Sequence, residues 1–164
     1  MMTESEFLAA YDRFADALFR HCFFRVYDRE RARDLVQETF VRTWEYVAKD
    51  KDIENIRAFL YRVANNLIID ESRRKRALSL DELLEKGFDP AGHDSSEDIQ
   101  TELDTQAVVK ALDGLKDESK ELVIMRYIDG FGPKEIADII GLSENVISVR
   151  LNRAVKELRG LIKP

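Results

Sequence analysis

A set of side chains close to the carboxyl end of the chain has the types and the spacing to bind nucleic acid. Its members recur at three- and four-residue intervals, so they share one face of a helix that Ser143 can cap. They are Ser148, Val149, Asn152, Arg153 and Lys156. A helix with such a face, placed after a short turn that contains glycine, has the form that enters a DNA major groove. The alternative is an ordinary helical hairpin with a solvated face.

The segment before this face supplies the turn. Pro133 suits the first turn of a helix, and Gly132 is a tolerable N-cap for it. The apolar stripe of that helix consists of Ile136, Ala137, Ile139 and Ile140. Gly141 then supplies the left-handed residue that commonly ends a helix. Residues 132–159 therefore predict a helix-turn-helix.

A basic cluster lies at the end of another helix, expected at about 56–76 and capped by Asn55. The cluster consists of Arg73, Arg74, Lys75 and Arg76. The polar side of the same helix is expected to expose Tyr61, Arg62, Asn65 and Asn66. Cations bind phosphates, and exposed aromatic and amide groups suit unstacked bases. Cations at a helix C-terminus also complement the helix dipole, so both explanations remain open.

A third polar face belongs to a helix expected at about 29–48, which Asp28 can cap. The face consists of Asp34, Gln37, Glu38 and Arg42. Glu38 and Arg42 are four residues apart and form a favourable pair worth a few tenths of a kcal/mol. As residue chemistry this is a solvated face, and the alternative is a surface that docks on a partner protein.

Other kinds of chemistry are not indicated. The sequence shows no nucleophile–base pair, phosphate loop or metal-ligand cluster, so we expect no enzyme activity, no cofactor and no metal. Cys22 is the only cysteine, and we interpret it as a packed thiol because adjacent residues such as His21 point to a different helix face. No apolar run approaches the roughly 20 residues of a membrane span, and the first residues lack a signal-peptide pattern. We expect no membrane insertion and a cytoplasmic location.

The charge of the chain is unevenly distributed. The formal net charge is -6, yet residues 1–76 hold 15 Lys and Arg against 14 Asp and Glu. Residues 111–164 hold nine of each sign, whereas residues 77–110 hold two basic and nine acidic residues. Two near-neutral blocks on either side of an anionic one indicate two modules and a linker.

The helical pattern agrees with this division. Helices are expected at about 6–26, 29–48 and 56–76, and again at about 99–113 and 118–128 before the helix-turn-helix. We therefore predict an all-α protein with two small helical domains, residues 1–76 and 101–164. Residues 77–100 form a flexible acidic linker that contains Gly87 and Pro90. We expect the chain to be a monomer when it is free.

Four stretches together resemble the extracytoplasmic-function (ECF) sigma factors, the minimal members of the sigma-70 family. ARDLVQETFVRTWEYV is similar to the helix of that family that docks on RNA polymerase, and IRAFLYRVANNLIIDESRRKRA is similar to its promoter-melting helix. SLDEL resembles a common start of the linker, and EIADIIGLSENVISVRLNRAVKELR resembles the second DNA-binding helix pair. A helix-turn-helix alone is shared by many proteins, whereas four stretches in this order are specific.

The resemblance implies a role for each group of residues. The core polymerase, through its clamp and flap, and promoter DNA become the expected partners, and an anti-sigma protein is expected to cover the same surfaces. The clamp would contact Asp34, Gln37, Glu38 and Arg42. The melted minus-ten strand would be held by Tyr61, Arg62, Asn65, Asn66, Arg73 and Arg74, with the loop Lys49–Ile56 helping to capture a flipped base. The minus-thirty-five element would face Ser148, Val149, Asn152 and Arg153, with Arg150 and Lys156 nearer the DNA backbone.

One segment departs from the family. The recognition helix of the family often begins Gly-Thr-Val followed by Lys or Arg, whereas this chain has Asn145, Val146, Ile147 and Ser148. The minus-thirty-five sequence therefore cannot be taken from relatives. Two other functions remain as alternatives: a sigma mimic that binds an anti-sigma protein without DNA, and a stand-alone helix-turn-helix repressor.

Overall fold

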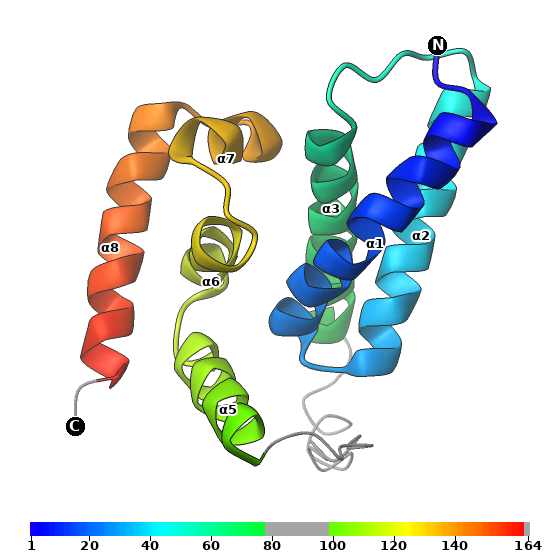
Figure 1. The fold of residues 1–164 in the computed structure, drawn as a ribbon. Coiled ribbons are helices and arrows are strands. Elements are labelled where there is room, and N and C mark those ends of the chain that lie inside the picture. Colours follow the sequence, from blue (N-terminus) through cyan, green and yellow to red (C-terminus); the bar gives the residue numbers. More distant parts are fainter. Residues whose placement is uncertain (78–98, 163–164) are drawn as a thin grey trace. The chain divides into compact units, whose positions relative to one another are not determined.

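The structure is a computed structural model that describes residues 1–77 and 99–162, all of them helices and the short turns between helices (Figure 1). The all-α class predicted from the sequence is confirmed. The described residues fall into two compact units, one within 1–77 and one within 99–162. Most of the predicted linker lies outside the described residues.

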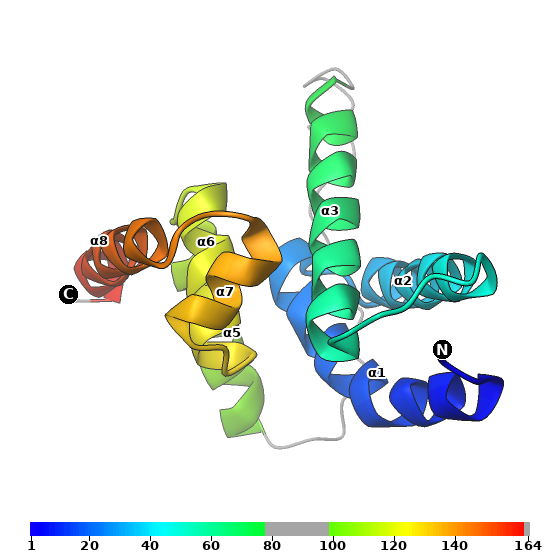
Figure 2. The ribbon, with the colours of Figure 1, turned by 90° about the horizontal axis from the view of Figure 1, so that it is seen from above.

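Three helices build the N-terminal unit: α1 (Glu4–Val26), α2 (Arg29–Ala48) and α3 (Ile56–Ala77). Each packs against the other two. In Figure 2, which views the molecule from above, α1 and α2 lie close together and α3 crosses them. α3 therefore has two neighbours on its inner side, which decides which of its residues reach solvent.

Caps fix where these helices begin. The side chain of Asp28 accepts a hydrogen bond from the Arg31 amide at 3.1 Å, and that of Asn55 accepts one from the Ala58 amide at 3.1 Å, as the sequence predicts. α1 begins two residues earlier than predicted because Thr3 and Glu6 form a reciprocal capping box.

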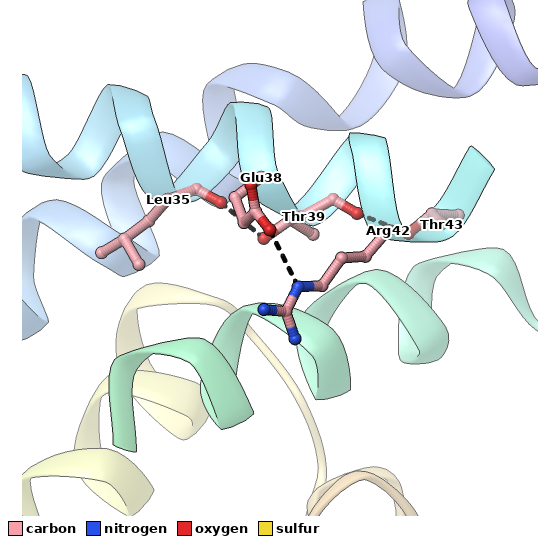
Figure 3. A network of polar contacts seen from close by, with 5 residues as sticks. All are labelled: Leu35, Glu38, Thr39, Arg42 and Thr43. Carbon is pink, nitrogen blue, oxygen red and sulfur yellow. Dashed lines mark hydrogen bonds and ion pairs between the residues drawn. The ribbon is translucent and has the colours of Figure 1, made fainter. Parts of the chain in front are cut away.

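The core of this unit is mostly apolar and includes Leu18 and Cys22 of α1 with Leu60 and Ala64 of α3. Cys22 is fully buried, which confirms its interpretation as a packed thiol. Two buried threonines of α2 satisfy their hydroxyls within the helix (Figure 3). Thr39 donates to the Leu35 carbonyl and Thr43 to the Thr39 carbonyl, each at 2.7 Å. Because these polar groups are paired, α2 can turn this side entirely to the core.

The C-terminal unit begins with α5 (Ile99–Asp113) and α6 (Asp117–Val123). α5 packs on the last helix of the unit and buries Val109 and Leu112. The burial of Val109 does not follow from the sequence, because helical periodicity alone does not show which side of α5 its neighbour covers.

A π-helix, η1 (Ile124–Ile128), replaces the end of the single helix predicted at 118–128. The Asp129 amide donates to the Ile124 carbonyl at 2.9 Å, which is the wider five-residue spacing. The extra residue in the turn keeps Ile124 and Met125 in the core and leaves Tyr127 exposed.

The helix-turn-helix consists of α7 (Pro133–Ile140) and α8 (Glu144–Ile162). Gly141 ends α7 in the left-handed conformation, with φ of 86°, and Ser143 accepts a hydrogen bond from the Val146 amide at 3.3 Å. Ile136 of α7 and Ile147 of α8 are fully buried at the corner. These contacts confirm the predicted turn and fix the rotation of α8 about its axis.

The left-handed turn leads to a prediction with a matched control. Gly141→Ala should lower the free energy of unfolding of the C-terminal unit by about 1–2 kcal/mol, because an alanine at positive φ is strained. Gly160→Ala should raise it by about 0.5–1 kcal/mol, because Gly160 lies inside α8 with open space around it.

Urea unfolding of the full chain, followed by circular dichroism and by tryptophan fluorescence, separates the two units. Trp44 is the only tryptophan and lies in α2, so its fluorescence reports the N-terminal unit. The two substitutions should shift the circular dichroism transition in opposite directions and leave the fluorescence transition in place. Equal effects of both substitutions would contradict the assigned turn.

Candidate nucleic-acid and protein interfaces

The outward face of α2 carries the predicted docking residues. Asp34, Gln37, Glu38 and Arg42 are all exposed, on the side of α2 opposite the buried threonines. Figure 3 shows the one ion pair among them, from Arg42 Nε to Glu38 Oε1 at 2.9 Å. Both partners are about half exposed, so the pair contributes only about 0.3–0.5 kcal/mol. The face is thus polar and accessible, and its ion pair contributes little to the stability of the fold.

An apolar side chain that the sequence analysis missed lies at the centre of this face. Val41 is 51% exposed and follows Gln37 by four residues and Glu38 by three, so it lies between them on the helix surface. Trp44 is partly exposed at the edge of this face, with its ring 4.9 Å from that of Phe7. In the sequence, Val41 falls outside the apolar stripe of α2, and this position is the feature that could have indicated its exposure. A polar rim around apolar groups is the usual composition of a protein interface.

Two predicted residues of α3 are not where the sequence placed them. Tyr61 is 1% exposed, and its ring packs edge-on against His21 of α1 at 5.2 Å. Asn65 is 4% exposed, and its Oδ1 accepts a hydrogen bond from Arg25 Nη1 of α1 at 2.7 Å. The expectation that these two residues are exposed is wrong, because α1 covers a side of α3 whose residues are polar.

The remaining predicted residues of α3 do face outward. Arg62, Asn66 and Arg73 are exposed and follow one another at spacings of four and seven residues, so they share one stripe, with Arg74 beside it. Arg31 of α2 forms an ion pair with Glu71, which ties the second half of α3 to α2. The side chains of Lys75 and Arg76 lie outside the described residues.

The loop Lys49–Ile56 connects α2 to α3 at the amino end of α3. Its backbone turns sharply at Asp50, which has φ of 59°. The Lys51 ammonium lies 5.1 Å from the centroid of the Tyr46 ring, and that ring contacts Phe59 of α3 at 4.7 Å. The loop therefore rests on an aromatic base beside the Arg62 end of the α3 stripe.

The outward face of α8 includes most of the residues predicted for it. Val149, Arg150, Asn152, Arg153 and Lys156 are exposed. Ser148 is only half-buried and lies at the side of the helix. Asn145 is exposed one turn before Val149 and joins this face.

The described part of the chain has neither a metal-ligand cluster nor a membrane-spanning helix. No group of three His, Cys, Asp or Glu side chains there converges as metal ligands would. None of the described helices has the length and apolar character needed to cross a membrane.

Comparison with known proteins assigns the chain to a family. Sigma-70 region 2 matches residues 10–78, and sigma-70 region 4 matches residues 105–158. The ECF RNA polymerase sigma factor SigL of Mycobacterium tuberculosis is 31% identical over 92% of this chain and 85% of its own length. The chain belongs to the ECF sigma factors of the sigma-70 family.

Solved structures show the same fold. The Bartonella quintana sigma factor RpoE, solved in complex with the anti-sigma factor NepR, has a TM-score of 0.78 and 24% identity over 96% of this chain and 97% of its own. CnrH, solved in complex with the cytosolic domain of CnrY, has a TM-score of 0.73 and 23% identity over 98% of this chain and 89% of its own.

Membership of the family settles the general activity. As an ECF sigma factor the chain directs promoter-specific initiation of transcription by RNA polymerase, and it is a non-enzymatic subunit. α1, α2 and α3 belong to region 2, and α8 is the second helix of the helix-turn-helix in region 4.

The burial of Tyr61 in region 2 leads to a second prediction. Tyr61→Ala should lower the free energy of unfolding of the N-terminal unit by about 3–5 kcal/mol, because it leaves a cavity between α1 and α3. Arg62→Ala, at the adjacent exposed position, should change it by no more than about 0.5 kcal/mol. Urea unfolding followed by Trp44 fluorescence measures both. A Tyr61→Ala protein as stable as Arg62→Ala would show that the ring does not pack in the core.

Proposed function

We propose that the outward faces of α2, α3 and α8 each bind a different partner of this sigma factor. The face of α2 docks on the clamp of core RNA polymerase, the exposed stripe of α3 holds the melted minus-ten strand, and the outward face of α8 binds the minus-thirty-five duplex. The observation that carries this proposal is the arrangement of α3. Tyr61 and Asn65 are buried against α1, whereas an exposed and mostly basic stripe consists of Arg62, Asn66, Asp70, Arg73 and Arg74.

The α2 face has the composition expected of a docking surface. Asp34, Gln37, Glu38 and Arg42 supply a rim that forms hydrogen bonds and ion pairs, and Val41 supplies an apolar centre. Central apolar contacts carry most of the energy of such interfaces, whereas rim charges contribute mainly to orientation. We therefore add Val41 to the docking residues.

The α3 stripe suits a single strand of DNA. Arg62, Arg73 and Arg74 would bind phosphates, and the Asn66 amide would hydrogen-bond a base. Tyr61 and Asn65, predicted to touch the strand, are too buried to do so without leaving their contacts with α1. In our proposal they position α3, and the loop Lys49–Ile56 lies where a flipped base would be captured.

The α8 face suits duplex DNA. Val149, Asn152 and Arg153 point away from the core and would meet base edges, while Arg150 and Lys156 would lie nearer the phosphates. Asn145 joins the base-facing residues in our proposal, and Ser148 would contact DNA only from the side. The unit that contains α8 would also contact the flap of the polymerase.

An anti-sigma protein is the third proposed partner. The two structures of similar fold were each solved as a complex, RpoE with an anti-sigma factor and CnrH with the cytosolic domain of CnrY. Val41 and Trp44 leave apolar area exposed on the docking side of region 2, which a protective partner would cover. We place the chain in the cytoplasm, where its polymerase acts, as a monomer when it is free of partners.

Run-off transcription from a promoter library with purified core polymerase tests the function. We expect transcripts to start at particular sites only when this chain is added. Transcription that stays independent of the chain at every site would contradict the proposal and favour the sigma mimic. Specific duplex binding by the chain without polymerase would favour the repressor.

A substitution at the centre of the α2 face tests the docking surface. Val41→Glu should weaken assembly with core polymerase by about tenfold or more, because it places a charge at the apolar centre of the interface. Leu8→Glu is the matched control, since Leu8 is equally exposed but lies on α1. Titration of core polymerase into each labelled variant gives the affinities. Equal weakening by both variants would argue against docking through the α2 face.

A further inference from the structure

One exposed valine lies at the centre of the outward face of α8. Val149 is 50% exposed and is two residues from Ile147 and two from Leu151, both of which are buried. At about 100° per residue, this spacing places Val149 on the side of α8 directly opposite the core. The Val149 side chain therefore points toward the DNA if α8 enters a major groove.

Most of the exposed neighbours of Val149 on α8 are polar. Asn145 lies one turn before it, and Asn152 and Arg153 lie one turn after it, all of them exposed. Val146, three residues earlier, is apolar but is itself 37% exposed, and Val149 still keeps half of its surface in water. Burial of an apolar side chain is favourable when it is covered by another apolar group. A molecule that covers this face of α8 should therefore place an apolar group against Val149.

The C5-methyl of thymine is the methyl group that the bases present in the major groove, and the groups that identify the other bases there are hydrogen-bond donors and acceptors. Resting on the proposed binding of α8 to the minus-thirty-five duplex, we propose that Val149 contacts the methyl group of a thymine in that element. The adjacent amides of Asn145 and Asn152 suit adenine, which a side-chain amide binds at N6 and N7. The site therefore reads an A·T-containing segment.

The chemistry of valine sets the expected base preference. Valine can neither donate nor accept a hydrogen bond, so Val149 would favour thymine over cytosine through the methyl group and through the cost of covering the cytosine amine. Lys156 and Arg153, on the same face, supply the positive charge that the DNA backbone requires. This charge makes duplex DNA a better partner for the face than an apolar protein surface.

Selection followed by removal of single methyl groups tests the inference. Holoenzyme reconstituted with the full chain first selects templates from a library with a randomised minus-thirty-five element. The best template is then synthesised with each thymine of that element replaced in turn by deoxyuridine, which lacks only the C5-methyl group. Competition binding measures the affinity of the holoenzyme for each template.

We expect one replacement to weaken binding by wild-type holoenzyme about three- to fivefold, the effect of losing one buried methyl group. Holoenzyme with Val149→Ala should bind the thymine and deoxyuridine templates equally. Val108→Ala is the matched control because Val108 is 46% exposed on α5 of the same unit, and this variant should keep the wild-type ratio.

Two results would overturn the inference, and they differ in what else they reject. A methyl effect that is absent, or that is the same in wild-type and Val149→Ala holoenzyme, would reject the role of Val149 and leave binding of the minus-thirty-five element by α8 intact. Failure of wild-type holoenzyme to enrich any sequence in the randomised element would reject both.

Discussion

The hydrogen bond between Arg25 of α1 and Asn65 of α3 is the constraint on which the arrangement of region 2 depends. It is 2.7 Å long, and Asn65 is almost fully buried, so rotating α3 about its axis would strand a polar group away from water. Such a loss costs about 1–3 kcal/mol. The Arg31–Glu71 ion pair adds a second link from α2. Together the two contacts set one rotation of α3, in which Arg62 and Asn66 lie outside.

The same division between a fixed inner side and an accessible outer side recurs in α2 and α8. In α2 the paired threonine hydroxyls allow close packing of the inner side, which leaves Val41 at the centre of the outer one. In α8 the buried Ile147 and the capped turn at Ser143 fix the helix so that Val149 points outward. Each proposed interface therefore stands on a helix whose rotation is set by its core. Preorganised side chains of this kind lose little conformational entropy when a partner binds.

The sequence predicted the helices, their caps and the helix-turn-helix, because these depend on local periodicity and on residues such as Asp28, Asn55 and Gly141. It did not predict the burial of Tyr61 and Asn65, because polarity alone does not show that a second helix covers a polar stripe. The exposure of Val41 does not follow from the sequence either, because an apolar residue outside the apolar stripe can be covered by a neighbouring helix or left in water. The π-helix at Ile124–Ile128 was also missed, because it depends on the packing of Ile124 and Met125 rather than on a local signal.

Permanganate oxidation of unpaired thymines in the open promoter complex reports strand separation at the minus-ten element, the step that the exposed side of α3 would support. We expect reactive thymines there only when the holoenzyme contains this chain. Replacing both Arg62 and Asn66 with alanine should lower their reactivity by about tenfold, the effect of losing roughly 1.4 kcal/mol of strand contacts, without changing assembly with core polymerase. Tyr61→Phe, which keeps the buried ring, should leave the reactivity unchanged. Full reactivity in the double variant, or its loss in Tyr61→Phe with assembly intact, would contradict the division of α3 into a buried positioning side and an exposed DNA-binding side.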